Sequence, residues 1–292
     1  MLLLSRAICA LQAPSAASLD ASKARGELRL WRSFERVSFR PVAVWELKTF
    51  FKTEDDMQRQ LGFRSAADQD RTTQALVAAS VGSAGGSLAL QAQPQPSLQA
   101  LGLLLAAAPF TLLGVYVAAP EVLRRVLVQV WRLDPRYRRR QVCHEAAHFL
   151  VGHLVGYAVQ SVAADGADNA VMFDVAGPRS EAELDLLAVV SLAGVAGEVL
   201  ECGNAEGGME DVRQLRGWME LLLPQSTPRE RDARIRWAML MALTLLQQRR
   251  AALEPLAAAI EGGQDVTECV RIVEETAGEV GRQEDAAVSA GG

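Results

Sequence analysis

A charge-free apolar stretch covers residues 98–119, where the chain reads LQALGLLLAAAPFTLLGVYVAA. About 20 such residues cross a membrane as a helix, and membrane helices tolerate the kink that Pro109 predicts. A buried core helix is the alternative. Residues 74–90 are also uncharged, but they are fewer and rich in Gly and Ser. They predict either a second, weaker span or a linker, with a turn at the QPQPS sequence that ends at Ser97.

Beyond this stretch the apolar positions recur mostly at helical spacing. Ser180 and Glu183 fit a capping box, and Pro228 suits the first turn of a helix. The predicted helices cover residues 134–156, 180–202, 209–223, 227 to beyond 250, and 265–276. Two β-prone runs, 157–163 and 170–175, flank a polar turn and predict a hairpin. The fold class is therefore mainly α, with a small β-hairpin and one or two preceding transmembrane helices.

Charge is distributed unevenly, although the 292-residue chain carries a formal net charge of only -5. Seven Arg lie between Glu121 and Arg140, directly after the apolar stretch, whereas the part from Glu181 onward is rich in Asp and Glu. Because Lys and Arg collect on the membrane side that is not translocated, this cluster favours a membrane span over a core helix. No aromatic-rich DNA or RNA motif accompanies the cluster, so the pattern predicts no nucleic-acid binding.

Residues 1–26 are nearly free of acids and contain Arg6 and Lys23 among many Ser, Ala and Leu. This composition resembles an organellar transit peptide, with a secretory signal or a disordered tail as alternatives. The four Cys form no C-x-x-C pair, which indicates reduced thiols. Residues 27–73 mix aromatic and charged side chains in a pattern that assigns no function. We expect a disordered tail at 281–292.

An H-E-x-x-H motif begins at His144, inside the predicted helix 134–156. Residues four apart lie one turn apart on the same face of a helix. The imidazoles of His144 and His148 can therefore bind one zinc ion, and Glu145 is placed to take a proton from a zinc-bound water. The chain has only three His, and two of them occupy these positions. The motif thus predicts a metalloprotease.

A zinc protease needs a third protein ligand and one position open to water. Along a helix, Cys143 points about 100° away from His144, and His153 points about 140° away from His148. Both are less favoured as ligands than a carboxylate. Spacing alone does not choose among the nearby carboxylates, which are Glu181, Glu183, Asp185, Glu198, Glu201, Glu210 and Asp211.

Three segments occur in the order typical of a known family. They are the helix HEAAHFLVGHLVG, the sequence SLAGVAGE ending at Glu198, and the sequence GMEDV around Asp211. They are similar to the family's H-E-A-G-H, A-G-R-x-A-E-E and G-x-x-x-D-[LI] segments. The stretch from Tyr137 to Glu275 thereby resembles the peptidase domain of the FtsH-type zinc metalloproteases, a helical zincin-like domain that we expect within 121–280.

The resemblance implies that His144, His148 and Asp211 bind zinc, and that Glu145 is the general base. Glu198 is the second choice as a ligand, or an outer group that orients a histidine. The family's Gly, Arg and first Glu are replaced here, respectively, by Ala147, Val195 and Gly197.

The sequence contains no G-x-x-x-x-G-K-[ST] phosphate loop, so it lacks the ATPase that usually feeds such a site. In this it resembles the short, ATPase-free members of plant and algal plastids. That resemblance implies an organelle membrane, of the chloroplast rather than the mitochondrion, with the peptidase domain on the stromal or matrix side. The expected function is a membrane-anchored zinc endopeptidase for unfolded or membrane-protein substrates, in an oligomer or with an ATPase-bearing protease partner. A catalytically silent scaffold, adaptor or chaperone with the same fold is the alternative.

Overall fold

The computed structural model of the protein describes residues 13–34, 38–51, 53, 57, 71–119, 122, 126, 130–131, 133–162, 171–175 and 177–276. These residues are mostly helical with one antiparallel pair of strands, so the predicted mainly α class with a small hairpin is confirmed. The chain divides into two compact units. One consists of Met1–Phe63 together with Arg138–Gly292, and the other of Arg64–Tyr137.

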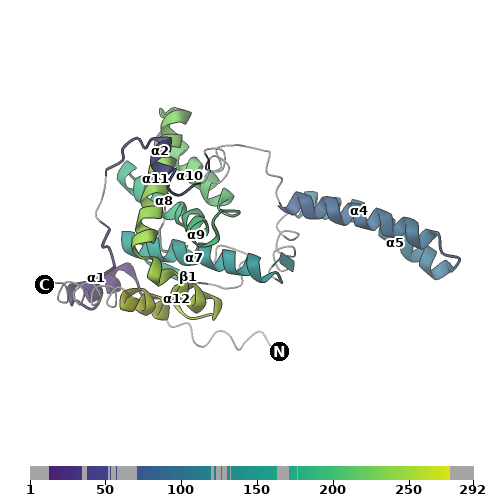
Figure 1. The fold of residues 1–292 in the computed structure, drawn as a ribbon, viewed down its shortest axis with the longest axis horizontal. Helices are drawn as coiled ribbons and strands as arrows, with labels where there is room; N and C mark the ends of the chain where they lie inside the picture. Colours follow the sequence, from purple (N-terminus) through teal and green to yellow (C-terminus); the bar gives the residue numbers. More distant parts are fainter. Residues whose placement is uncertain are drawn as a thin grey trace. The chain divides into compact units, whose positions relative to one another are not determined.

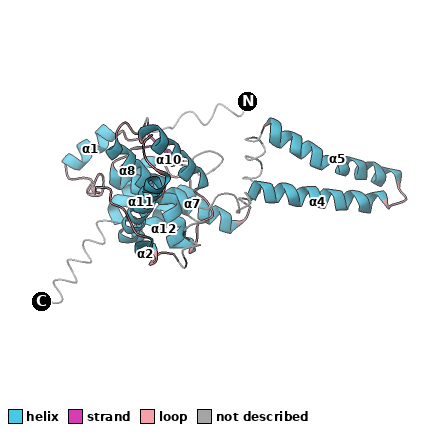
Figure 2. Cartoon of the chain, turned by 90° about the horizontal axis from the view of Figure 1, so that it is seen from above, coloured by secondary structure: helices cyan, strands magenta, loops and turns pink. Residues whose placement is uncertain are grey.

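The smaller unit contains two long helices, α4 (Arg71–Gln91) and α5 (Pro96–Ala118). They run antiparallel and side by side (Figures 1 and 2). The turn between them covers residues 92–95, whereas Pro96 and Ser97 of the predicted QPQPS turn already belong to α5. Residues 74–90 are therefore helical and not an irregular linker. Within the described residues, α5 is the one helix that is long and apolar enough to cross a membrane.

The larger unit is organised around α7 (Pro135–Val155), which carries the H-E-x-x-H motif (Figure 1). Its residues from Ala146 to Leu154 are all buried, as expected of a helix enclosed by the core. The other helices of this unit are α1 (Ala16–Ala24), α2 (Val44–Leu47), α8 (Glu181–Ser191), α9 (Ala193–Cys202), α10 (Met209–Leu222), α11 (Pro228–Gln248), α12 (Arg250–Glu261) and a helix at 266–276.

Two helices predicted as continuous are each interrupted once. The helix expected after Ser180 is α8 followed by α9, with Leu192 between them. The helix expected after Thr227 is α11 followed by α12, with Arg249 between them. Both begin where predicted, because the side chains of Ser180 and Thr227 accept hydrogen bonds from N–H groups of the first turn. Neither interruption coincides with Gly or Pro, so no local signal predicts it.

The predicted hairpin is confirmed, since β1 (Val159–Val162) and β2 (Val171–Phe173) pair antiparallel. Residues 163–170, which include the predicted polar turn, lie outside the described residues. β2 packs closely on α7, because a Cβ at Gly152 would lie only 2.2 Å from the Phe173 ring. The hairpin therefore lies along the helix that carries the motif.

A segment near the N-terminus covers the C-terminal end of α7. The backbone N–H groups of Arg32 and Phe34 donate to the carbonyls of His153 and Leu154, at 3.2 and 3.0 Å. The end of a helix leaves such carbonyls without intrahelical partners. Trp31 is fully buried, and its ring lies 5.2 Å from that of His153. The segment to which the sequence pattern assigned no function thus belongs to the same folded unit as the motif.

Helix α1 lies within residues 1–26, the segment predicted to be a transit peptide. The side chain of Ser15 caps α1, and Leu19 is part of the hydrophobic core. Residues 1–12 lie outside the described residues. The transit peptide stays a prediction, but its removal up to residue 26 would delete a helix that contributes to the core.

Candidate metal centre

Two histidines one turn apart on α7 converge on one point. His144 and His148 are both buried, with exposed fractions of 9% and 8%. Their Nε2 atoms lie 3.0 Å apart. The four-residue spacing therefore produces the geometry that the sequence predicts.

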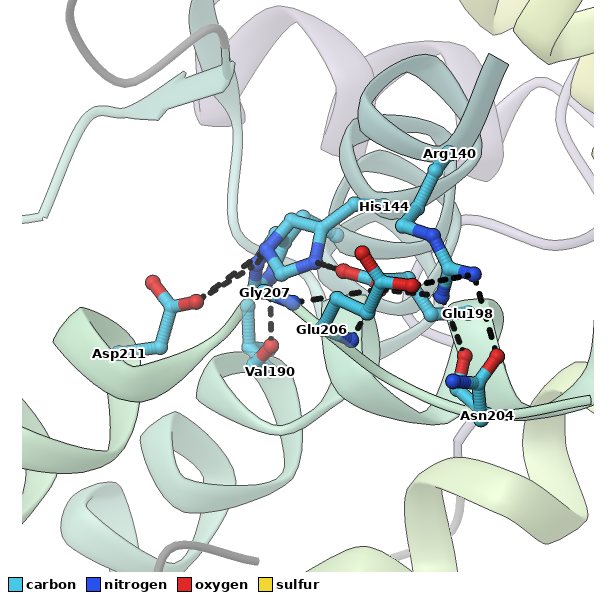
Figure 3. Close-up of polar contacts among 9 residues, drawn as sticks. Arg140, His144, Val190, Glu198, Asn204, Glu206, Gly207 and Asp211 are labelled. Carbon is cyan, nitrogen blue, oxygen red and sulfur yellow. Dashed lines mark hydrogen bonds and ion pairs between the residues drawn. The ribbon is translucent and has the colours of Figure 1, made fainter. Parts of the chain in front are cut away.

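Asp211 reaches the same point from the first turn of α10. Its Oδ2 lies 3.2 Å from Nε2 of His144 and 3.7 Å from Nε2 of His148 (Figure 3). Gly208, which precedes α10, has a φ of +84°, and a Cβ there would lie 2.1 Å from the side chain of Val195. Glycine is therefore required in the turn that brings Asp211 to the histidines.

His144, His148 and Asp211 could hold a metal ion, because their ligand atoms all lie within 4.8 Å of one another. The Nδ1 atoms of both histidines point to other acceptors. Nδ1 of His144 lies 2.8 Å from Oε1 of Glu198, and Nδ1 of His148 lies 2.8 Å from the Val190 carbonyl. Since a carboxylate and a carbonyl accept, we assign the ring proton to each Nδ1. Each neutral ring then turns its Nε2 lone pair toward the shared point.

These distances fit a tetrahedral ion. Zinc bonded to histidine at 2.0–2.1 Å separates two tetrahedral ligand atoms by about 3.3 Å. The separations among the three ligand atoms are 3.0, 3.2 and 3.7 Å. Two facing lone pairs repel each other unless a cation or a proton lies between them, so the donor set favours a bound cation.

The carboxylates around the histidines favour positive charge. Burial lowers the pKa of His144, but its hydrogen bonds to Asp211 and Glu198 and the charge of Glu145 outweigh burial and hold that pKa well above its ordinary value. Burial raises the pKa of Asp211, but hydrogen bonds with both histidines outweigh it and hold that pKa well below its ordinary value. The site therefore attracts a proton or a metal cation.

Glu198 orients His144 from the side opposite the shared point. It is 2% exposed, and it accepts hydrogen bonds from the backbone N–H groups of Glu206 and Gly207, at 2.8 and 3.3 Å (Figure 3). From the sequence, Glu198 is either the second choice for a metal ligand or a group that orients a histidine ligand. Its contact with Nδ1 of His144, and not with Nε2, fits the outer role.

Arg140 is a site residue that the sequence analysis missed. Its Nη1 donates to Oε2 of Glu198 at 3.1 Å and to the Asn204 carbonyl at 2.5 Å (Figure 3). Arg140 precedes His144 by four residues, so it lies on the same face of α7. That spacing was a signal in the sequence, but the seven-Arg cluster was interpreted only as a membrane-flanking charge.

Small residues let α9 approach α7 closely. A Cβ at Gly194 would lie 2.3 Å from Nε2 of His144, and a Cβ at Gly197 would lie 2.5 Å from Cβ of Ala147. The methyl group of Ala147 therefore occupies space that a side chain at position 197 would need. Positions 147 and 197 both differ from the FtsH-type pattern that the sequence resembles. The larger residue at 147 is thus accommodated by the smaller residue at 197.

Glu145 lies beside the metal group and contacts the hairpin. Its Oε2 accepts a hydrogen bond from the backbone N–H of Val171 in β2, at 3.2 Å. The residue is half-buried, and its charge contributes to the raised pKa of His144. Glu145 is therefore close to the candidate ligands without being one of them.

Among the described residues, the other sequence candidates do not join the ligand group. Burial raises the pKa of the Cys143 thiol to about 11, which disfavours the thiolate that binds metals. Nε2 of His153 lies 2.7 Å from a carboxylate oxygen of Glu274. The remaining carboxylates contact other partners: Glu181 and Asp185 bind Arg234, Glu183 binds the N–H of Arg179, Glu201 binds Arg250, and Glu210 binds Arg213.

A half-open cavity of about 480 Å³ lies at the C-terminal end of α7. Phe34, Tyr157, Val175 and Leu186 are among its lining residues, and none of the three candidate ligands lines it. Val175 lies two residues beyond the end of β2, so the strand leads from the side of Glu145 toward this cavity.

Comparison of the chain with protein-family models, with curated proteins and with solved structures found no match.

Proposed function

We propose that the protein is a membrane-anchored zinc endopeptidase in which Glu145 is the general base. The observation that carries this proposal is the convergence of both Nε2 atoms of the motif on the carboxylate of Asp211. Three protein ligands leave the fourth tetrahedral position open, as catalytic zinc sites require. The uncharged helix α5 supports the anchor.

His144, His148 and Asp211 would hold the zinc ion, which would lower the pKa of a water molecule and polarise the substrate carbonyl. Glu145 takes the proton of the attacking water and returns it to the leaving amine. Glu198 retains the Nδ1 proton of His144 through their 2.8 Å contact, which keeps Nε2 free for the metal. The Val190 carbonyl has the same effect on His148.

In the described part of the chain β2 pairs with a strand only on the side of β1, and its other edge suits an extended peptide substrate. The N–H of Val171 donates to Glu145, so the backbone of this residue faces away from β1. Because neighbouring residues of an antiparallel strand alternate in direction, the backbone of Phe173 faces the same way. An unpaired edge can add a peptide as a further strand. Such a peptide would pass Glu145 and continue toward the cavity at the end of α7.

The resemblance to FtsH-type peptidases supports the same reaction. Glu198 and Asp211 stand at the family's positions, and the contact between Ala147 and Gly197 makes two of the departures compatible with close helix packing. Without a phosphate loop in the sequence, we propose unfolded or membrane-protein chains as substrates, and an ATPase-bearing protease as a partner. We place the protein in an organelle membrane, favouring the chloroplast.

The test is a comparison of wild type with Glu145→Gln, both as the full chain in detergent. We expect one zinc ion per chain in both, because Glu145 is not a ligand. Cleavage of an unfolded, casein-type protein should fall by roughly 10²–10⁴ in rate in the variant, the usual cost of losing a general base.

Glu210→Gln is the matched control, because Glu210 is exposed on α10 next to Asp211 and, within the described part of the chain, forms an ion pair with Arg213 alone. Its rate should equal that of wild type. Equal cleavage by wild type and Glu145→Gln would overturn the mechanism. Zinc binding without any cleavage by wild type would instead favour a silent scaffold.

A further inference from the structure

The two helices of the smaller unit meet through small residues. A Cβ at Gly86 of α4 would lie 2.7 Å from the side chain of Leu105 in α5. A Cβ at Gly102 of α5 would lie 3.1 Å from the carbonyl of Ser87. Ser87 is only 4% exposed, and its hydroxyl accepts a hydrogen bond from Gln91 at 3.0 Å. Helix pairs inside membranes pack in this way, since small residues let the backbones approach.

The outward faces of both helices are apolar. The sequence has no Asp, Glu, Lys or Arg between Arg71 and Glu121. α4 has 21 residues, which as a helix extend about 30 Å, the thickness of the hydrocarbon core of a bilayer. An exposed apolar surface of this extent marks a membrane or partner contact. Its large exposed side chains are Val77, Val81, Leu88, Leu101, Leu103, Leu104, Phe110, Leu113, Val115, Tyr116 and Val117.

The residues before and after these helices fold together. The N–H of Arg32 donates to the His153 carbonyl, and the Glu274 carboxylate accepts from the N–H of Trp31 at 2.9 Å. Both parts of the chain belong to one compact unit. A folded unit cannot lie on both sides of a membrane. The chain must therefore cross the membrane an even number of times between its two parts.

We infer that α4 and α5 cross the membrane together as a two-helix hairpin, with residues 92–95 on the far side and the entire larger unit on the near side. The inference rests on the membrane anchorage proposed above. A single span at α5 would separate Trp31 from Glu274. The outer faces of both helices contact lipid acyl chains.

The sequences on either side of the hairpin carry charges that disfavour a further span. Residues 58–70 contain Arg64 and Asp68, and residues 120–134 contain Arg124 and Arg125. Charged side chains at such density are costly in the hydrocarbon core. Two crossings are thus the number that agrees with both the sequence and the folded unit.

The pairing explains why α4 crosses despite its Gly- and Ser-rich sequence. A helix alone needs large apolar side chains to offset its polar groups, whereas a paired helix can turn small residues toward its partner. The hydroxyl of Ser83 is bonded to the Ser80 carbonyl, and that of Ser87 to Gln91. These polar groups are satisfied within the hairpin.

The distribution of positive charge gives the same sidedness. Arg71 begins α4, and Arg124 and Arg125 follow α5, whereas the turn at 92–95 has no charged residue. Lys and Arg next to spans remain on the side that is not translocated. Both outer ends of the hairpin, and with them the larger unit, are therefore expected on that side.

The test is labelling of single added cysteines in the full chain, in sealed membrane vesicles, with a membrane-impermeant maleimide. Gln93→Cys reports on the turn, and Gln264→Cys and Glu27→Cys report on the two parts of the larger unit. All three positions are exposed. Wild type, treated identically, gives the background from the natural cysteines.

With the larger unit outside the vesicles, Gln264→Cys and Glu27→Cys should react at once, and Gln93→Cys only after detergent opens the vesicles. Immediate reaction of all three would show that the hairpin does not cross. Opposite sidedness of Glu27→Cys and Gln264→Cys would show a single span. Either result overturns the inferred hairpin but is compatible with a protein that is anchored in the membrane. Release by alkaline extraction would instead refute the anchorage itself, and none of these outcomes depends on proteolysis.

Discussion

Around His144, one residue is the proposed third metal ligand and two others hold the ring in place. Asp211 faces Nε2, whereas Glu198 faces Nδ1 and is itself held by Arg140. Substitution can separate these tasks. We expect Asp211→Ala to lose most of the bound zinc, because only two protein ligands remain. Glu198→Gln and Arg140→Met should keep zinc but weaken its binding by about 10–100-fold, the usual effect of outer groups.

Competition with a chelator of known affinity measures the zinc affinity of each variant. Glu210→Gln again serves as the control. Loss of zinc in Glu198→Ala with full zinc in Asp211→Ala would reverse the ligand assignment. Circular dichroism of each variant separates lost binding from lost folding, since Glu198 is buried.

At the residue scale, the site residues whose positions depend only on local helix geometry could be predicted from the sequence. His144, Glu145 and His148 follow from helical spacing alone, and the structure brings both histidines together. Asp211 lies far along the chain, and only the resemblance selected it from seven carboxylates. The orienting contact of Glu198 depends on how α9 packs on α7, which no spacing rule encodes.

At the scale of elements, Glu274 links the C-terminal helix to the N-terminal segment. Its carboxylate accepts from the N–H groups of Arg29, Leu30 and Trp31, and it contacts Nε2 of His153. We expect Glu274→Gln to lower the free energy of unfolding at neutral pH by roughly 1.5–3 kcal/mol, the range for hydrogen bonds to a charged group.

The effect should depend on pH with a defined sign. Burial raises the pKa of Glu274, but the contacts with His153 and the N–H groups outweigh burial and hold it below the ordinary value of 4.5. A carboxyl with a lowered pKa stabilises the folded state above its unfolded pKa, and this stabilisation disappears as pH falls through the folded value. Urea unfolding of wild type and Glu274→Gln should therefore differ at pH 7 and converge well below pH 4.5. A constant difference would contradict this assignment.

The packing of α1 limits where a transit peptide can be removed. Ser15 caps the helix, Leu19 is buried, and Lys23 donates to the Trp31 carbonyl. We expect the mature protein to begin at or before Ser15, because cleavage after residue 26 would expose this part of the core. N-terminal sequencing of the protein from its native membrane would test this. A mature N-terminus beyond Leu19 would contradict it.

Elements with strong local signals were predictable, and elements defined by distant contacts were not. The turn at 92–95, the caps at Ser180 and Thr227 and the hairpin all carry local residue signals, and the structure confirms them. The interruption at Leu192 has no such signal. The docking of the N-terminal segment on α7 joins residues more than a hundred positions apart, and the sequence pattern contains nothing that specifies this pairing.

At the scale of the whole molecule, the sequence contains no phosphate loop, so we expect the proposed site to act on chains that are already unfolded. A peptide that binds along β2 must be extended over several residues, and a stably folded protein exposes few such segments. We expect the full chain to cleave a denatured protein but not its native form, and ATP to leave both rates unchanged. The measurement compares the two forms of one substrate, with and without ATP, for wild type and Glu145→Gln. ATP-stimulated cleavage by the pure protein would reveal a nucleotide site outside any phosphate loop. Equal cleavage of native and denatured substrate would contradict binding in extended form. Stimulation that appears only after membrane extract is added would point to the separate ATPase-bearing partner, because the larger unit then receives chains unfolded elsewhere.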